Sequence, residues 1–313
     1  MQTSPDQGQV ADAVKGNWVD RHAPAPWRPY LRLSRADRPI GTWLLLIPCW
    51  WGLALAVAAT GLRWVDLWIA AGCAIGAVLM RGAGCTWNDV TDRDIDAGVA
   101  RTRSRPIPSG QVSVRAALLW LAAQALVACA ILLTFDRAAI ALGVLSLLPV
   151  AIYPFAKRFT WWPQVFLGVA FNWGALLAWA AHTGGLGWPP VLLYLGGIAW
   201  TLFYDTIYAY QDIEDDALIG VKSTARRFGD APAPWLRGFA VASVLLMAAA
   251  VTAALPAGPA AVAIAGVLAM GGHMAWQLGR LEIGDPALCL RLFRANRTAG
   301  LLPLPFFAAS ALV

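Results

Sequence analysis

Two short stretches of this chain hold most of its acidic residues. The sequence has 313 residues, 59% of them hydrophobic and only 18 acidic, and ten of the acids lie within residues 89–96 and 205–230. A carboxylate at membrane depth costs roughly 2.5–3.5 kcal/mol on insertion scales, so two such clusters need a cation or a function to keep them there. Paired oxygen ligands suit Mg²⁺, which proteins usually hold with one or two carboxylates together with substrate phosphates. The sequence therefore predicts a site for Mg²⁺ and phosphate.

The spacing within each cluster fits a helix that continues past its apolar run. Three polar residues of the first cluster are spaced i, i+4 and i+8, and three of the second are spaced i, i+7 and i+11, so each set falls on one helical face. These residues are Asn88, Asp92 and Asp96 in the first cluster, and Asp205, Asp212 and Asp216 in the second. We expect the two acidic faces to lie opposite each other at the mouth of one cavity. The alternative, solvated loops whose acids cap helices, does not explain two clusters at matching positions.

Basic segments accompany the acidic clusters. One follows the first cluster, one follows the second, and a third ends the fourth apolar run between them. Their sequences are Arg101-Thr-Arg-Ser-Arg105-Pro-Ile-Pro-Ser-Gly110, Gly220-Val-Lys-Ser-Thr-Ala-Arg-Arg227 and Tyr153-Pro-Phe-Ala-Lys-Arg158. The prolines and glycine of the first segment predict a structured turn. Carboxylates that hold a metal ion, alternating with bases that reach phosphate directly, are the parts that a diphosphate site requires.

The elements that must position these residues are membrane-spanning helices. A mean hydropathy of +0.58 with 13% charged residues places the chain among polytopic membrane proteins. Nine apolar runs of about 20 residues are candidate spans: 40–60, 64–87, 114–134, 138–155, 163–181, 190–210, 235–255, 258–279 and 298–313. We expect an all-α, polytopic membrane bundle of about nine transmembrane helices that encloses a cavity. Residues 1–37 are expected to form a polar cytoplasmic tail, and residues 38–313 a single transmembrane domain.

The basic residues predict the orientation of this bundle. With a cytoplasmic N-terminus, 22 of the 24 Lys and Arg residues fall on the cytoplasmic side and only Arg63 and Arg137 on the other, which is a strong positive-inside asymmetry. Both acidic clusters then face the cytoplasm, and nine spans would put the C-terminus outside. The net charge of +6 follows from this topology and needs no nucleic-acid partner. The five Cys residues show no paired spacing, and we interpret them as small buried hydrophobic residues.

Several motifs stand in order along the chain from about residue 30. Arg35-Ala-Asp37-Arg-Pro39-Ile-Gly41 enters the first span, and Asn88-Asp-x-x-Asp92-x-x-x-Asp96 is followed by Arg101-Thr and Arg105-Pro-x-Pro-Ser-Gly110. Tyr153-Pro-Phe-x-Lys157-Arg158 ends the fourth span, and Asp205-Thr-x-Tyr208-Ala-x-x-Asp212-x-x-Asp215-Asp216 precedes Gly220-x-Lys222-Ser-Thr224. Through these motifs the chain resembles the UbiA superfamily of intramembrane prenyltransferases, and within it the 4-hydroxybenzoate polyprenyltransferases of ubiquinone biosynthesis.

The resemblance implies an activity and its substrates. A polyprenyl group would pass from polyprenyl diphosphate to the ring carbon ortho to the hydroxyl of 4-hydroxybenzoate, with release of diphosphate. The expected cofactor is Mg²⁺, bound by both acidic motifs, and the expected setting is a lipid bilayer, the bacterial inner membrane, with the active site facing the cytoplasm. An apolar bilayer cavity would shield the allyl cation from water until the ring attacks it.

The resemblance also assigns roles to single residues. The expected Mg²⁺ ligands are Asn88, Asp92, Asp212 and Asp216, with Asp96 as an outer member. The expected diphosphate contacts are Lys157, Arg158, Arg101 and Lys222, with Lys157 favoured. On the acceptor side, Arg35 would bind the aromatic carboxylate, Asp205 would accept the phenol proton, and Tyr208 and Tyr153 would position a substrate.

Two alternatives to this function stay open. Within the superfamily, the acceptor could be a naphthoate, haem, a chlorophyllide or a glycerol-phosphate lipid. From another class, a cation-coupled transporter also places carboxylates inside a helical bundle, but it would want them near mid-membrane on broken helices. Acidic clusters at one membrane face, beside conspicuous basic segments, disfavour the transporter.

Overall fold

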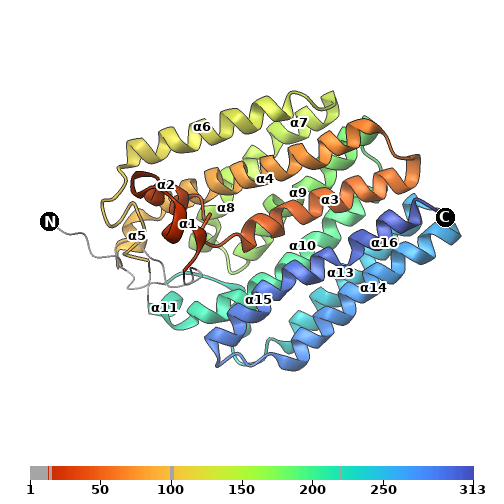
Figure 1. The fold of residues 1–313 in the computed structure, drawn as a ribbon. Coiled ribbons are helices and arrows are strands. Elements are labelled where there is room, and N and C mark those ends of the chain that lie inside the picture. Colours follow the sequence, from red (N-terminus) through yellow and green to blue (C-terminus); the bar gives the residue numbers. More distant parts are fainter. Residues whose placement is uncertain (1–12, 14–15, 99–101, 219) are drawn as a thin grey trace. The chain divides into compact units, whose positions relative to one another are not determined.

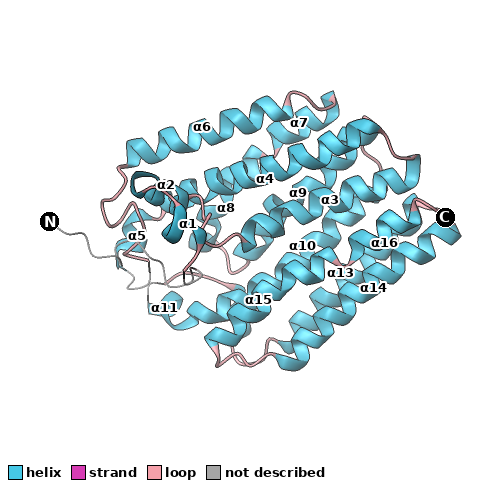
Figure 2. Ribbon diagram, in the orientation of Figure 1, coloured by secondary structure: helices cyan, strands magenta, loops and turns pink. Residues whose placement is uncertain are grey.

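The computed structural model describes residue 13 and residues 16–98, 102–218 and 220–313 (Figure 1). The side chains of Asp212 and Asp215 lie outside this description. Within the described ranges every regular element is a helix, and Figure 2 shows only helices joined by loops. The predicted all-α class is confirmed.

Eight helical segments among the described residues are long and apolar enough to cross a membrane. They are α3 (Ile40–Thr60), α4 (Trp64–Thr91), α6 (Val114–Leu132), α7 with α8 (Arg137–Leu145 and Leu147–Phe159), α9 (Pro163–Thr183), α10 (Trp188–Ala209), α13 (Ala233–Ala254) and α14 (Ala257–Arg280). Their limits follow the first eight predicted spans closely, because apolar runs of about 20 residues match the hydrocarbon thickness of a bilayer. The chain is an integral membrane protein.

The predicted ninth span at residues 298–313 differs in the structure. Two shorter helices, α15 (Pro286–Leu301) and α16 (Pro303–Ser310), meet at Leu302. Pro303 and Pro305 have no N–H group to continue the helical hydrogen bonds of α15, so a new helix begins there. The predicted start at residue 298 therefore lies inside α15. The outward C-terminus, which depended on nine spans, stays a prediction.

The helices fall into two compact units. The N-terminal unit comprises residues 1–42 and 75–131, and the larger unit comprises residues 43–74 and 132–313. The first acidic motif lies in the N-terminal unit and the second in the larger unit.

The N-terminal unit packs short helices around the end of α4. It includes α1 (Trp18–His22), η1 (Ala25–Trp27), α2 (Arg28–Leu33), α5 (Arg93–Gly98) and α6. Its buried core consists of Leu33, Val90, Ile107, Val112 and Ala117. Residues of the predicted polar tail are thus folded, with Leu33 in this core. The proposed boundary at residue 37 falls inside the unit and stays a prediction.

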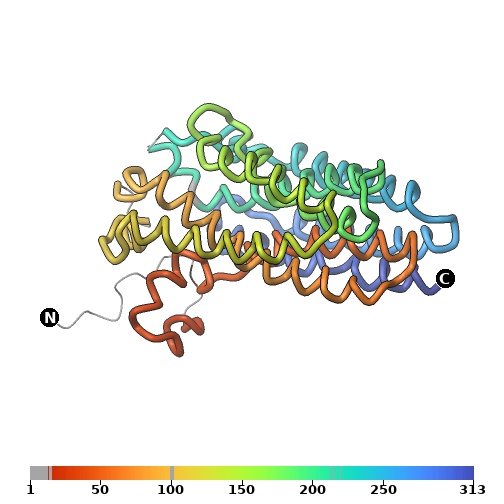
Figure 3. Tube along the Cα trace, turned by 90° about the horizontal axis from the view of Figure 1, so that it is seen from above, coloured from red at the N-terminus to blue at the C-terminus, as the bar shows by residue number. Residues whose placement is uncertain are grey.

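The larger unit is built around α10, which packs against α9, α13 and α15. Figures 1 and 3 both show α14 and α16 side by side at the C-terminal end of the chain, in agreement with their contacts. At Gly52 the backbone of α3 comes so close to Ala175 of α9 that a Cβ atom would overlap its carbonyl, so only glycine fits there. The neighbouring Trp51 is fully buried and donates its indole N–H to the Gly300 carbonyl over 2.7 Å. These contacts join α3, α9 and α15.

A buried histidine closes the turn between α3 and α4 in the larger unit. His182 Nδ1 lies 2.6 Å from Asp66 Oδ1, and its Nε2 lies 2.6 Å from Thr60 Oγ1. Asp66 also accepts the backbone N–H of Arg63 over 2.6 Å. The buried ring nitrogens of His182 and the buried carboxylate of Asp66 therefore have hydrogen-bond partners within this cluster.

Candidate active site

The first acidic motif begins in the last turn of α4 and continues past its end. This helix runs to Thr91, the chain bends at Asp92, and α5 resumes at Arg93. The Asp92 N–H donates to the Asn88 carbonyl over 2.9 Å, and the Asp96 N–H donates to the Asp92 carbonyl over 2.8 Å. Helical hydrogen bonding therefore continues through the bend, and the three polar residues keep the spacing that the sequence predicts. Asp92 is fully buried, Asp96 is buried and Asn88 is half-buried.

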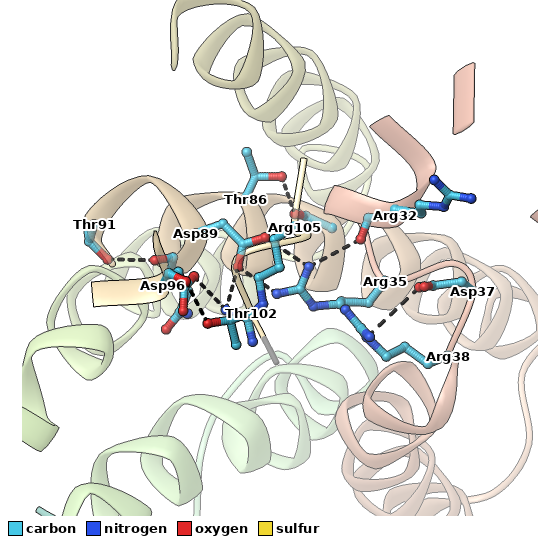
Figure 4. Close-up of polar contacts among 12 residues, drawn as sticks. Arg32, Arg35, Asp37, Arg38, Thr86, Asp89, Thr91, Asp96, Thr102 and Arg105 are labelled. Atoms are coloured by element: carbon cyan, nitrogen blue, oxygen red, sulfur yellow. Dashed lines mark hydrogen bonds and ion pairs between the residues drawn. The ribbon is translucent and has the colours of Figure 1, made fainter. Parts of the chain in front are cut away.

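A network of ion pairs surrounds the motif (Figure 4). Asp89 is fully buried and accepts two hydrogen bonds from Arg35, from Nη2 to Oδ1 over 2.6 Å and from Nη1 to Oδ2 over 2.9 Å. Arg105 Nη1 lies 3.3 Å from Asp89 Oδ1 and 2.7 Å from Asp96 Oδ2. Arg105 therefore joins two acids of the motif, and Arg35 secures one of them with a bidentate contact.

Burial also affects the protonation of Asp96. It raises the pKa of the Asp96 carboxyl above its ordinary value, and the carboxylates of Asp89 and Asp92 act in the same direction. The guanidinium of Arg105 opposes the rise in this pKa. Without that ion pair Asp96 would hold its proton to still higher pH.

Arg35 occupies an unusual backbone conformation at the end of α2. Its φ is +57°, the only positive φ outside glycine among the residues that the structure describes. The Ala36 N–H donates to the Leu31 carbonyl over 2.9 Å and the Arg35 N–H to the Arg32 carbonyl over 3.0 Å. This pattern is a Schellman motif, whose left-handed position is usually glycine. An arginine stands there instead, and its side chain reaches Asp89.

The second acidic motif begins inside α10. Asp205 and Tyr208 are half-buried on this helix, and the Tyr208 ring packs on Phe293 with centroids 4.5 Å apart. After Ala209 the chain tightens into a 3₁₀ turn, η2 (Tyr210–Asp212), and continues as α11 (Ile213–Leu218). The prediction of an unbroken α-helix through Asp216 is therefore wrong, because the 3₁₀ turn changes the angular spacing of its side chains.

The segment after the second motif folds back onto the end of α8. The Lys222 N–H donates to the Lys157 carbonyl over 3.1 Å, and Lys222 Nζ donates to the Phe159 carbonyl over 3.4 Å. The Val221 N–H donates to the Asp216 carbonyl over 3.0 Å, as does Arg226 Nη1 over 3.3 Å. The larger unit thus brings the chain at Lys157, Lys222 and Asp216 together.

Two of the other predicted site residues, Tyr153 and Arg158, lie on α8. Tyr153 is half-buried in α8, and Arg158 in the last turn of that helix is exposed, with its guanidinium 5.1 Å from the centre of the Phe155 ring. Arg101 and the side chain of Asp212 are not among the residues that the structure describes. Their predicted roles stay predictions.

The match to a known family covers most of the chain. The model of the UbiA prenyltransferase family matches residues 45–302. The chain belongs to this family. Its match extends across both compact units and includes both acidic motifs.

Curated UbiA relatives are similar over nearly the whole length. The chain is 46% identical over 305 residues to the 4-hydroxybenzoate polyprenyltransferase, mitochondrial, of Bos taurus, covering 96% of this chain and 81% of the relative. It is 47% identical over 282 residues to the human protein of the same name, with coverages of 90% and 74%. The Arabidopsis thaliana protein of that name is 44% identical over 299 residues, with coverages of 94% and 72%.

Solved structures of UbiA homologues share the fold. A homologue from Archaeoglobus fulgidus bound to GPP and Mg²⁺ matches with a TM-score of 0.67 and 20% identity, covering 91% of this chain and 100% of that one. The apo structure of a homologue from Aeropyrum pernix K1 matches with a TM-score of 0.66 and 24% identity, covering 86% and 96%. These matches confirm the UbiA fold.

The first acidic motif offers carboxylate and amide oxygens, the kind of ligand that Mg²⁺ prefers. No group of three or more His, Cys, Asp or Glu side chains that could hold a metal ion occurs within the described part of the chain. The first motif nevertheless places a fully buried carboxylate, Asp92, one helical turn from the amide of Asn88. Because Mg²⁺ is usually held by one or two carboxylates with substrate phosphates, such a pair suffices as the protein's share from one motif.

Sequence reasoning missed Asp89 and Arg105 as site residues. Both lie inside the motifs that the sequence analysis identified, but their contacts join residues that are up to 54 positions apart. The available signal was the surplus of acids in the first cluster, of which only Asp92 and Asp96 had predicted roles.

Proposed function

We propose that this chain transfers a polyprenyl group from polyprenyl diphosphate to the ring carbon ortho to the hydroxyl of 4-hydroxybenzoate, with release of diphosphate, in ubiquinone biosynthesis. The observation that carries the proposal is the identity of 44–47% over 90–96% of the chain to relatives that bear this name. Family membership and the two acidic motifs support the same reaction class.

We assign the diphosphate end of the reaction to the acidic and basic motifs. The proposed Mg²⁺ ligands are Asn88, Asp92, Asp212 and Asp216, with Asp96 as an outer member, and the assignment rests on the motif sequences. When bound, Mg²⁺ supplies positive charge that offsets the negative charge growing on the leaving oxygens. Lys157 is the favoured direct contact to the diphosphate, with Lys222, Arg158 and Arg101 as further candidates. The hydrogen bond between the backbones of Lys222 and Lys157 supports placing these two together.

The acceptor end requires a proton acceptor and a group for the carboxylate. Asp205 is the proposed acceptor of the phenol proton, which makes the ring more nucleophilic. Tyr208, held against Phe293, and Tyr153 are proposed to orient a substrate. Asp205 is half-buried on α10, and a site that excludes water would protect an allyl cation until the ring attacks it.

Arg35 is the predicted partner of the aromatic carboxylate, and its contact with Asp89 sharpens the test. The variant Arg35→Ala is expected to raise KM for 4-hydroxybenzoate by about one to two decades, because a charge-assisted hydrogen bond contributes roughly 1.5–3 kcal/mol. KM for the prenyl diphosphate should rise less, and only through the loss of the contact between Arg35 and Asp89. Steady-state kinetics with each substrate varied in turn measures both values. Equal losses for both substrates would show that Arg35 serves Asp89 alone, and Arg38 would become the next candidate.

We also propose that the protein lies in a bacterial inner membrane with its active site facing the cytoplasm. The support is the charge asymmetry, with 22 of 24 basic residues on one side of the predicted topology. The charge asymmetry supports the orientation, whereas the three relatives carry mitochondrial names. Reporter fusions after residue 100 and after residue 225 should both report cytoplasm. A periplasmic signal at either position would overturn the orientation.

A membrane assay tests the function directly. Membranes containing the full chain are supplied with 4-hydroxybenzoate and geranyl or longer diphosphates, with and without Mg²⁺, and the prenylated acid is measured. Product that forms only with Mg²⁺ supports the proposal. Product with a naphthoate or a glycerol-phosphate lipid in place of 4-hydroxybenzoate would instead favour another acceptor within the family. Uptake of a cation into vesicles without any product would favour a transporter.

A further inference from the structure

Asp89 stands beside the proposed Mg²⁺ ligand Asn88, yet the proposed function gives it no role. Its side chain is fully buried and accepts hydrogen bonds from Arg35 and Arg105. Separating a buried carboxylate from its basic partners is strongly unfavourable, because it leaves an uncompensated buried charge. Asp89 therefore holds Arg35 and Arg105 in place. Figure 4 shows both guanidinium groups directed at Asp89.

Arg105 carries this restraint from Asp89 to the end of the motif. Its Nη1 is shared between Asp89 Oδ1 and Asp96 Oδ2, and its side chain is only 16% exposed. Thr102, three residues earlier on the same loop, donates its hydroxyl to the Asp96 backbone carbonyl over 2.9 Å. Asp96 is thus held by the loop through both its side chain and its backbone. The position of Asp96 therefore depends on where Asp89 holds Arg105.

Arg35 fixes Asp89 from the other side. It takes the left-handed position of the Schellman motif, where a side chain is disfavoured and glycine is usual. Its Nη1 also donates to the Arg32 carbonyl over 3.2 Å, which holds the guanidinium against the end of α2. The bidentate contact with Asp89 is the interaction that this costly backbone conformation makes possible.

We propose that Asp89 is a positioning residue for the Mg²⁺-dependent transfer. It anchors Arg35 and Arg105, and through Arg105 it fixes Asp96 and the end of the first acidic motif in the geometry that binds Mg²⁺ and diphosphate. This inference rests on the proposed function, in which Asn88 and Asp92 are Mg²⁺ ligands. Replacing Asp89 is expected to lower the affinity of the site for Mg²⁺ together with diphosphate, in addition to any effect on folding.

The test measures binding without turnover. The full chain, purified in detergent, is titrated with Mg²⁺ in the presence of geranyl diphosphate and without an aromatic acceptor, and the thermal unfolding midpoint is followed. The Asp89→Asn variant is expected to raise the Mg²⁺ concentration for half-maximal stabilisation at least tenfold, equivalent to about 1.4 kcal/mol. Asp94→Asn is the matched control, because it makes the same change in the same motif at a side chain that is 86% exposed. It should stay within twofold of the unchanged protein.

Two further variants separate positioning from folding and from net charge. Arg105→Lys keeps the charge at a partly exposed loop residue but shortens the side chain, so its ammonium group is not expected to bridge Asp89 and Asp96 as Nη1 of Arg105 does. This variant should also raise the Mg²⁺ requirement, even if Asp89→Asn does not fold. The double variant Asp89→Asn with Arg35→Gln restores the charge balance but not the anchor for Arg105, and it should stay impaired.

Each contrary result has a distinct meaning. Recovery of the unchanged Mg²⁺ requirement in the double variant would show that Asp89 only balances charge, which overturns the proposal. A requirement within twofold of the unchanged protein in Arg105→Lys, or in a folded Asp89→Asn, would also overturn it. If the unchanged protein shows no Mg²⁺-dependent stabilisation with geranyl diphosphate, the proposed function fails first, and this inference fails with it.

Discussion

Replacement of Asp92 by alanine is expected to abolish prenyl transfer while the protein still inserts into the membrane. Asp92 is fully buried one helical turn from Asn88, and the proposal makes both residues ligands of the ion that offsets charge on the leaving diphosphate. Such charge stabilisation contributes several kcal/mol, so turnover should fall by at least about a hundredfold. Asp212→Ala should have the same effect, because neither motif alone holds the diphosphate. Product formation in membranes, normalised to the amount of inserted protein, measures both losses.

The control for this prediction lies in the same motif. Asp94 is exposed and lies 3.5 Å from Arg93 at the surface, so Asp94→Ala should keep nearly full activity. Excess chelator should mimic the Asp92 variant in the unchanged protein. Substantial turnover in chelator, or in either the Asp92 or the Asp212 variant, would contradict a diphosphate clamp that uses both motifs.

The variant Asp205→Asn is expected to lower kcat by about two to four decades with little change in either KM. The substitution keeps the shape of the side chain and removes its capacity to accept a proton, and general-base catalysis typically contributes a factor of this size. Steady-state kinetics with 4-hydroxybenzoate and a prenyl diphosphate measures kcat and both KM values.

Asp230 offers the matched comparison for Asp205. It belongs to the same unit and is exposed, so Asp230→Asn should leave kcat unchanged. A raised KM for either substrate with an unchanged kcat in Asp205→Asn would place this residue in binding and would require another proton acceptor.

The sequence predicted the spans well because hydropathy and bilayer thickness decide them. The structure begins α3 at Ile40 and α9 at Pro163, as expected, and α6 and α13 differ from their predicted limits by no more than two residues. The last predicted span differs because α15 begins at Pro286, before the predicted start, and Pro303 separates α15 from α16. A count of apolar residues does not predict such a break, because it ignores the backbone N–H that proline lacks.

Local spacing predicted the first acidic motif better than the second. The hydrogen bonds from Asp92 to Asn88 and from Asp96 to Asp92 keep an α-helical repeat, so counting residues placed these side chains correctly on one face. In the second motif, η2 replaces an α-helical turn. Tyr210 within that turn is buried and donates its hydroxyl to the Gly229 carbonyl over 2.6 Å. A contact between residues 19 apart is invisible to a count along one helix.

The conformation of Arg35 has a consequence for the order in which the protein folds. A left-handed arginine is disfavoured by on the order of 1–2 kcal/mol, so the turn after α2 is not stable on its local sequence alone. Its stabilising partner, Asp89, lies 54 residues further along the chain. During synthesis, the turn is therefore expected to gain this contact only after the first transmembrane hairpin is complete and the end of α4 has emerged. This turn is made before Asp89, and it is expected to be among the later parts to reach its native form.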